Sequence, residues 1–291
     1  MQVNSIDMNE VNNILSSLGK GYKMLSSIGL GGQKEVYKIE NCNHEIQIFK
    51  IIKPTPDSLE RIKREIRASE IIDDEHIPKI LFTNADKADN PNIIWIIEEY
   101  VEGNNLRECL KDGRKFTVAD IILFLDTMFS ILEKSESKHI IHRDIKPENI
   151  LLDKTGKYWL IDFGIARHLD LDSLTDSNSP FGPGTWGYSA SEQFRNRKHD
   201  IDIRADLFSV GVVAEEMILG YNPYTDKVNN VIAVIKRIEQ VPLPLLRIDG
   251  DTRFLLAQFL RLLGDNRIFR RPSSVKEAKD IFAVIKPTLA I

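Results

Sequence analysis

The chain has 291 residues and a formal net charge of −4, because 39 basic side chains face 43 acidic ones. Apolar residues make up 42% and charged residues 28% of the chain, which excludes a disordered polypeptide and allows an ordinary core. The acidic balance excludes a broad nucleic-acid surface, and no apolar stretch reaches the roughly 20 residues of a membrane span. We therefore expect a globular, cytoplasmic protein with no nucleic-acid or membrane partner. Its two cysteines, Cys42 and Cys109, are too few for a disulfide framework and are expected to be packing residues.

The first hundred residues predict mainly strands. Residues 1–20 are expected to form an N-terminal extension, helical or frayed, with no special role; the alternative is a small extra helix around residues 9–18 that docks on the lobe or on a partner. Hydrophobic patterning then predicts strands at 22–28, 35–40, 45–51 and 93–101, and one amphipathic helix at 57–73.

Helical patterns dominate the rest of the chain. Residues 117–138 predict a helix in which Thr117 and Asp120 form a capping pair. Residues 166–189 form one long irregular stretch rich in serine, threonine, proline and glycine, and such loops are usually functional. We expect a strand-rich lobe at about 21–101, a hinge at about 99–105 and a helical lobe at about 106–286.

One segment carries the sharpest chemical signal. It reads Ile140-Ile-His-Arg-Asp-Ile-Lys-Pro-Glu-Asn-Ile-Leu-Leu152, and Asp162-Phe-Gly164 follows ten residues later. Together they resemble the catalytic loop and metal-binding motif of eukaryotic-type (Hanks-type) protein kinases, and Lys146 matches the serine/threonine branch. The resemblance implies an α+β bilobal protein kinase fold over 21–291. Its small lobe would hold an antiparallel sheet and one helix, and its larger lobe would be mainly helical.

The resemblance also implies the roles of these residues in phosphoryl transfer from ATP. Asp144 would accept or orient the proton of the attacking hydroxyl, and Lys146 would neutralise the transferred phosphoryl group. Asn149 and Asp162 would hold Mg²⁺, which prefers oxygen ligands; Mn²⁺ fits the same ligands. Leu151 would lie under the nucleotide base.

A glycine-rich segment between the first two predicted strands resembles the kinase loop that covers the phosphates. A lysine, Lys34, stands where the family has a third glycine. The resemblance assigns nucleotide contacts to Ile28, Gly29, Leu30, Gly31, Gly32 and Val36.

Lys50 is our choice for the strand lysine that contacts the α- and β-phosphates, and Lys53, close to the breaking prolines, is the alternative. The family usually has alanine two positions earlier, where this chain has Ile48. The acidic partner of the lysine is expected to be Glu65, on the apolar face of the predicted helix, with Glu70 as the alternative.

The segment 96–103 resembles the kinase hinge, whose backbone groups bind adenine. In this register those groups belong to Glu99 and Val101. Glu98 then falls where a hydrophobic residue is usual. Either the register slips by one residue or the back of the nucleotide pocket is polar.

The irregular stretch resembles an activation segment, closed by Gly184-Thr185. Two arginines, Arg143 and Arg167, suggest a phosphate pocket that would order the segment after phosphorylation; an unmodified loop is the alternative. The candidate phosphate acceptors are Thr175, Ser177 and Ser179. Thr185 is the threonine of this segment that would lie near the catalytic loop.

Two further ties are expected in the helical lobe. Glu192 would pair with Arg271, and Asp206 would anchor the backbone of the catalytic loop.

We predict a serine/threonine protein kinase that uses ATP and acts on protein substrates. One alternative is a pseudokinase-like nucleotide-binding scaffold, favoured by Lys34, Ile48 and Glu98. The other is a kinase acting on a small molecule. The sequence gives no prediction of oligomeric state.

Overall fold

The computed structural model describes residues 8–30, 34–54, 58–86, 93–162, 186–194, 201–228 and 230–290, without the side chains of Leu30, Arg61, Glu65 and Ala68. Within these ranges the chain forms two compact units. Unit 1 lies within residues 8–71 and 78–102, and unit 2 lies within 72–77, 103–162 and 186–290. The division after Glu102 falls inside the segment expected to be a hinge.

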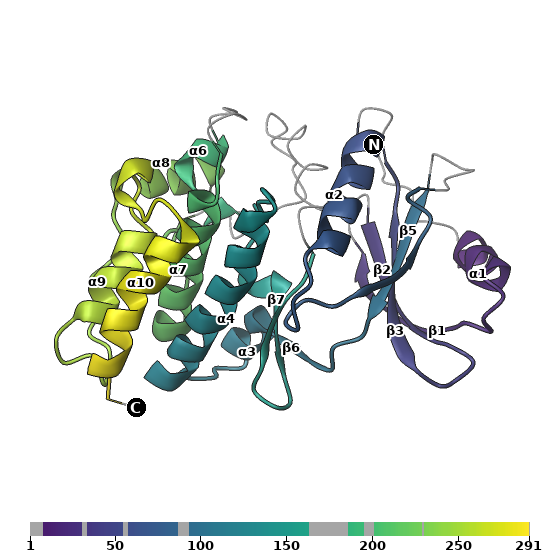
Figure 1. Cartoon of the computed structure of the whole chain (residues 1–291), viewed down its shortest axis with the longest axis horizontal. Coiled ribbons are helices and arrows are strands. Elements are labelled where there is room, and N and C mark those ends of the chain that lie inside the picture. The colour runs from purple at the N-terminus through teal and green to yellow at the C-terminus, as the bar shows by residue number, and fades with distance from the viewer. Residues whose placement is uncertain are drawn as a thin grey trace. The chain divides into compact units, whose positions relative to one another are not determined.

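Unit 1 is built on an antiparallel sheet of five strands in the order β1-β2-β3-β5-β4, of which β1, β2, β3 and β5 are labelled in Figure 1. The strands β3 and β5 lie side by side, and their register places Lys50 opposite Ile96 and Ile48 opposite Glu98. Its elements are α1 (Met8–Ser17), β1 (Lys23–Leu30), β2 (Lys34–Glu40), β3 (Ile46–Ile52), α2 (Leu59–Ile71), β4 (Ile80–Thr83) and β5 (Ile94–Glu99).

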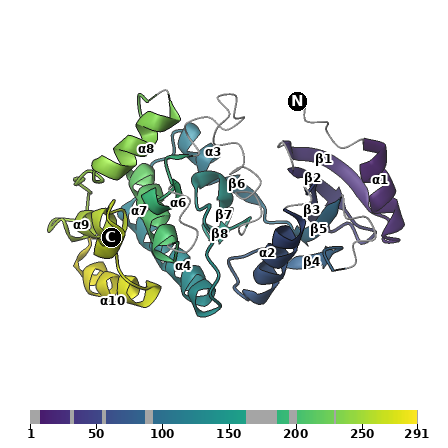
Figure 2. The same ribbon diagram turned by 90° about the horizontal axis from the view of Figure 1, so that it is seen from above.

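Two helices cover opposite faces of this sheet (Figure 2). On one face, Val11 and Leu15 of α1 pack into a buried cluster with side chains such as Tyr37 and Phe49. On the other face, Ile62 of α2 belongs to a second buried cluster. The segment expected to be an extension without special role therefore contributes to the core of unit 1.

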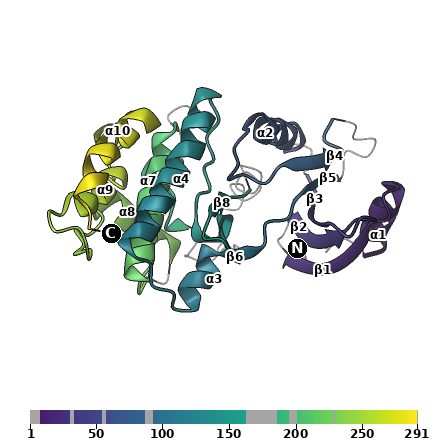
Figure 3. The ribbon, with the colours of Figure 1, turned by 60° about the horizontal axis from the view of Figure 1, so that its bottom comes forward.

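Unit 2 is mainly helical. Its helices α4, α7 and α10 run side by side (Figure 3), and a small antiparallel sheet has the order β6-β7-β8. Its strands and longer helices are β6 (Gly103–Asn105), α3 (Leu106–Lys111), α4 (Val118–Ser137), β7 (Ile150–Asp153), β8 (Tyr158–Leu160), α7 (Arg204–Leu219), α8 (Val231–Gln240), α9 (Leu255–Leu263) and α10 (Val275–Ile285). The short helix α6 spans Ser191–Phe194, and 3₁₀ turns span η1 (Pro147–Asn149), η4 (Ile268–Arg270) and η5 (Lys286–Thr288).

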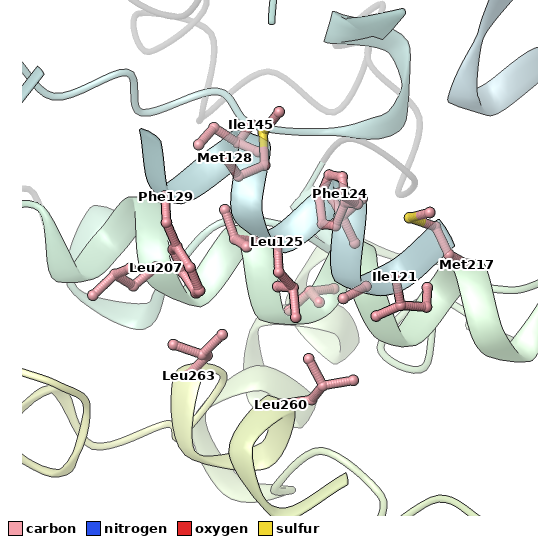
Figure 4. Packing of buried hydrophobic residues seen from close by; sticks show 14 of the residues in the cluster. Ile121, Phe124, Leu125, Met128, Phe129, Ile145, Leu207, Met217, Leu260 and Leu263 are labelled. Atoms are coloured by element: carbon pink, nitrogen blue, oxygen red, sulfur yellow. The ribbon is translucent and has the colours of Figure 1, made fainter. Parts of the chain in front are cut away.

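The core of unit 2 lies between α4, α7 and α9 (Figure 4). Phe124 and Phe129 of α4 and Leu260 of α9 are buried there. Gly211 of α7 lets α9 approach closely, because a Cβ at this position would lie 2.9 Å from the Cβ of Leu263. Helix α7 also buries Glu215, and neither carboxylate oxygen of Glu215 has a hydrogen-bond partner among the described residues.

The structure confirms most of the predicted elements within two residues of their expected bounds. Thr117 caps α4, with a capping box completed by Asp120. Residues 103–105, expected to be part of the hinge, form the short strand β6, because they pair with β7. The prediction for the cysteines holds for Cys109, which is buried, and is wrong for Cys42, which is exposed. None of the helices in the described ranges is long and apolar enough to cross a membrane.

Candidate active site

The loop between α4 and η1 is anchored through its backbone to a buried carboxylate. Asp206, in the first turn of α7, accepts hydrogen bonds from the backbone N–H groups of His142 (2.7 Å) and Arg143 (2.8 Å). The side-chain amide of Gln193 donates to the carbonyl oxygen of Arg143 at 3.2 Å. These contacts confirm the expected role of Asp206. They hold the loop through the N–H groups of His142 and Arg143 and through the carbonyl oxygen of Arg143.

The side chain of His142, in the same loop, is fully buried. Burial lowers the pKa of its imidazole to about 4, although the charge of Asp144 acts in the opposite direction. The neutral ring can therefore donate from Nε2 to the carbonyl oxygen of Ile161 (3.2 Å) and accept at Nδ1 from the Asp144 backbone N–H (3.3 Å). The ring thus ties the loop to the segment after β8.

The side chain of Asp144 is fixed by two polar neighbours. Lys146 Nζ lies 2.8 Å from Asp144 Oδ2, and Asn149 Nδ2 donates to the same oxygen at 2.8 Å. Burial by itself lowers the pKa of Lys146, but the adjacent Asp144 carboxylate raises it overall, so Lys146 stays protonated. A carboxylate held beside an ammonium group is suited to orient a hydroxyl next to a developing phosphoryl charge.

Asn149 and Asp162 are brought close through the backbone. Ile161, which precedes Asp162, donates its N–H to the carbonyl oxygen of Asn149 at 2.9 Å. Asp162 adopts a left-handed conformation with φ of 62°, an uncommon conformation that clusters at functional sites. The amide and carboxylate oxygens fit a hard divalent cation that completes its shell with water and phosphate. The described residues contain no group of three or more His, Cys, Asp or Glu side chains that could hold a metal.

The predicted strand lysine has an acidic partner inside the sheet of unit 1. Lys50 lies in the middle of β3 and is 4% exposed, whereas Lys53 lies beyond the end of the strand. Lys50 Nζ donates to Oε2 of Glu98 on the neighbouring strand β5. Glu98 is itself 8% exposed, so this ion pair is largely removed from water. Glu65 lies in α2, but its side chain is outside the described residues.

This pair bears on the two explanations of Glu98. The register of β3 and β5 places Glu98 and Lys50 on one face of the sheet, two residues apart along the strand. The surroundings of Lys50 are therefore polar, whereas the register of the hinge relative to the family stays a prediction.

The remaining predicted nucleotide contacts divide between the two units. In unit 1, Val36 lies opposite Lys50 in the register of β2 and β3, and Ile28 is 55% exposed at the end of β1. Glu99 ends β5, and Val101 follows it. Gly29 lies in β1, whereas Gly31, Gly32 and the side chain of Leu30 are outside the described residues.

In unit 2, the strand β7 separates its side chains between two faces. Ile150 and Leu152 are buried, whereas Leu151 lies on the opposite face and is partly exposed. This alternation leaves Leu151 available for a contact outside the core.

Most of the predicted activation-segment residues lie outside the described part of the chain: Arg167, Thr175, Ser177, Ser179 and Thr185. Arg143 is described and has a left-handed backbone with φ of 65°. Beyond the segment, Arg271 NH1 and NH2 bind the two oxygens of Glu192 at 2.6 and 3.2 Å. This fork-like contact confirms the expected ion pair.

The sequence did not reveal one further charged group beside the catalytic loop. Arg107, in the first turn of α3, contacts Glu148 of η1 and Glu216 of α7. An arginine in a six-residue helix carries no signal of such contacts, because its partners are 41 and 109 residues away.

Comparisons with known proteins agree with this geometry. The family model of the protein kinase domain matches residues 22–270. A probable serine/threonine-protein kinase of Streptomyces coelicolor is 31% identical over 71% of this chain and 31% of its own length. A probable serine/threonine-protein kinase of Clostridium acetobutylicum is 28% identical over 92% of this chain and 40% of its own length. The chain thus spans about a third of the length of the curated relatives it matches.

Proposed function

Because this chain belongs to the protein kinase family, we propose that it transfers the γ-phosphoryl group of ATP to serine or threonine hydroxyls of protein substrates. The observation that carries the proposal is the fixed carboxylate of Asp144. It lies between the ammonium group of Lys146 and the amide of Asn149, on a loop anchored by Asp206.

The proposed roles follow from the chemistry of these groups. Asp144 orients the attacking hydroxyl and accepts its proton, while Lys146 balances the charge of the phosphoryl group in transfer. Lys50 binds the non-transferred phosphates of ATP. Asn149 and Asp162 would hold a divalent cation, Mg²⁺ in our proposal, which supplies positive charge against the phosphate oxygens when bound.

The class of acceptor is supported by the relatives. They are named serine/threonine-protein kinases, which favours a protein substrate over a small molecule. We further propose that the protein acts in the cytoplasm, in keeping with its two unpaired cysteines. Ordering of the activation segment by phosphorylation of Thr175, Ser177 or Ser179 stays a prediction.

The test is a transfer assay with labelled ATP and Mg²⁺, run with the protein alone and with a generic protein substrate. We expect label on serine or threonine, and its loss in Asp144→Asn, which keeps the size of the side chain. Label on small molecules only would contradict the proposed acceptor. Nucleotide binding without any transfer would instead identify a nucleotide-binding scaffold.

A further inference from the structure

The ion pair between Lys50 and Glu98 lies among apolar side chains on one face of the sheet of unit 1. Lys50 lies opposite Ile96 in the register of β3 and β5, and Glu98 follows two residues later on the same face. Glu98 itself lies opposite Ile48, and Val36 of β2 flanks Lys50 from the other side. The side chains of Lys50 and Glu98 are 5% and 11% exposed, so water screens their charges poorly.

A phosphate that binds Lys50 has to share its ammonium group with Glu98. Nζ of Lys50 donates to Oε2 of Glu98, and a phosphate oxygen on the same nitrogen would accept at about 2.8 Å. The hydrogen bonds of a tetrahedral ammonium group diverge by about 109°, which places the phosphate oxygen about 4.5 Å from Oε2. At this distance two anionic oxygens in poorly screened surroundings repel each other.

Displacement of Glu98 from Lys50 by the phosphate also costs free energy. Glu98 is 8% exposed, and a carboxylate that loses its counter-ion at such a place is poorly solvated. Sharing and displacement therefore both weaken phosphate binding relative to a chain with a neutral side chain at this position. In such a chain the ammonium group of Lys50 lacks this carboxylate, and a phosphate gains more by supplying the missing negative charge.

We propose that Glu98 sets the nucleotide affinity of this protein by competing with the phosphates of the nucleotide for the ammonium group of Lys50. The inference rests on the proposed function, in which Lys50 binds the non-transferred phosphates. Glu98 acts through Lys50 and is a positioning residue, because this role requires no contact between Glu98 and the nucleotide. The competition concerns phosphate alone, so adenosine, which has no phosphate, is not affected by it.

The test is a calorimetric titration of ATP with Mg²⁺, and separately of adenosine, into the full chain. The variants are Glu98→Gln, Lys50→Met and the double variant that combines them. Glutamine keeps the length of the side chain and an oxygen that can accept from Lys50 Nζ, while the charge is removed. The matched control is Glu40→Gln, which removes an equal charge from β2 of the same sheet together with the contact to His44 at 3.3 Å. Thermal unfolding without ligand verifies that each variant is folded.

We expect Glu98→Gln to bind ATP about fivefold more tightly than the wild type, which is within the range of coupling inside one ion-pair network. Its affinity for adenosine should equal that of the wild type, and Glu40→Gln should bind both ligands as the wild type does. In the Lys50→Met background the gain from Glu98→Gln should vanish, because no ammonium group is left to compete for.

An ATP affinity of folded Glu98→Gln that is unchanged or weaker would overturn the inference, since Glu98 would then not oppose the phosphates. An equal gain for adenosine, or a gain that persists without Lys50, would overturn it as well, because the effect would then lie outside phosphate binding. The labelled-ATP transfer assay separates these results from failure of the proposed function. Tighter ATP binding by Glu98→Gln without transfer in any variant supports the inference and contradicts kinase activity, whereas transfer with an unchanged ATP affinity contradicts the inference alone.

Discussion

The buried pair of Lys50 and Glu98 gives the sharpest prediction for unit 1. Replacing Glu98 by methionine leaves the Lys50 ammonium group without this carboxylate at a place where its side chain is 5% exposed. Removing one member of a buried ion pair typically costs 3–5 kcal/mol, because the remaining charge is poorly solvated. The side chains of Lys50 and Glu98 are 5% and 11% exposed, so water still reaches part of each. We therefore expect a loss at the lower end of this range, about 3 kcal/mol in the free energy of unfolding.

The assay is urea denaturation followed by circular dichroism, with the free energy extrapolated to water. Glu99→Gln is the control, since this adjacent, partly exposed residue loses the same charge and keeps an oxygen that can accept from the Lys79 backbone N–H. In the double variant Lys50→Met/Glu98→Met the buried ammonium group is removed together with the carboxylate, so most of the stability should return. A loss below about 1 kcal/mol in Glu98→Met, or an equal loss in the double variant, would refute the reasoning.

Three further predictions concern unit 2. Lys146→Met should lower the transfer rate by about 10²-fold, as loss of one charge-stabilising donor does, while nucleotide affinity measured by calorimetry stays within about threefold. Burial raises the pKa of Glu215 from 4.5 to about 8, so the folded chain holds a proton that the unfolded chain releases. The free energy of unfolding should therefore fall by up to about 1.4 kcal/mol per pH unit as the pH rises between these values. In Glu215→Gln the urea midpoint should depend less on pH across that range. Arg271→Ala should lower the free energy of unfolding by about 3 kcal/mol, because the buried Glu192 carboxylate then lacks its ion-pair partner; a melting temperature equal to the wild type would contradict this.

The catalytic loop was the most predictable part of the site. The functional side chains Asp144, Lys146 and Asn149 lie within six consecutive residues, so a local backbone conformation is enough to bring them together. Helix α4 was also predictable, because its apolar periodicity and its Thr117 cap are local signals. Local spacing therefore gave both the candidate chemistry and much of the secondary structure.

The contacts that depend on tertiary structure were not predictable. The pairing of Lys50 with Glu98 depends on which strands are neighbours in the sheet, and chain order does not state that β3 lies beside β5. A buried glutamate in an apolar strand needs a partner, but the sequence analysis assigned the lysine to Glu65 and not to Glu98. Arg107 gave no signal at all, since its position beside Glu148 and Glu216 is set by the packing of α3 in unit 2.

The helix α1 bears on how fragments of this protein are designed. The family match begins at residue 22, and a fragment cut there loses Val11 and Leu15, which are 0% and 2% exposed. Each buried aliphatic side chain contributes about 1.5–3 kcal/mol, and their loss uncovers apolar side chains such as Tyr37 and Phe49. A recombinant fragment that starts at the family boundary should therefore melt earlier and aggregate more readily than one that starts at residue 8. For this chain, the boundary given by family similarity is narrower than the smallest part that should fold well.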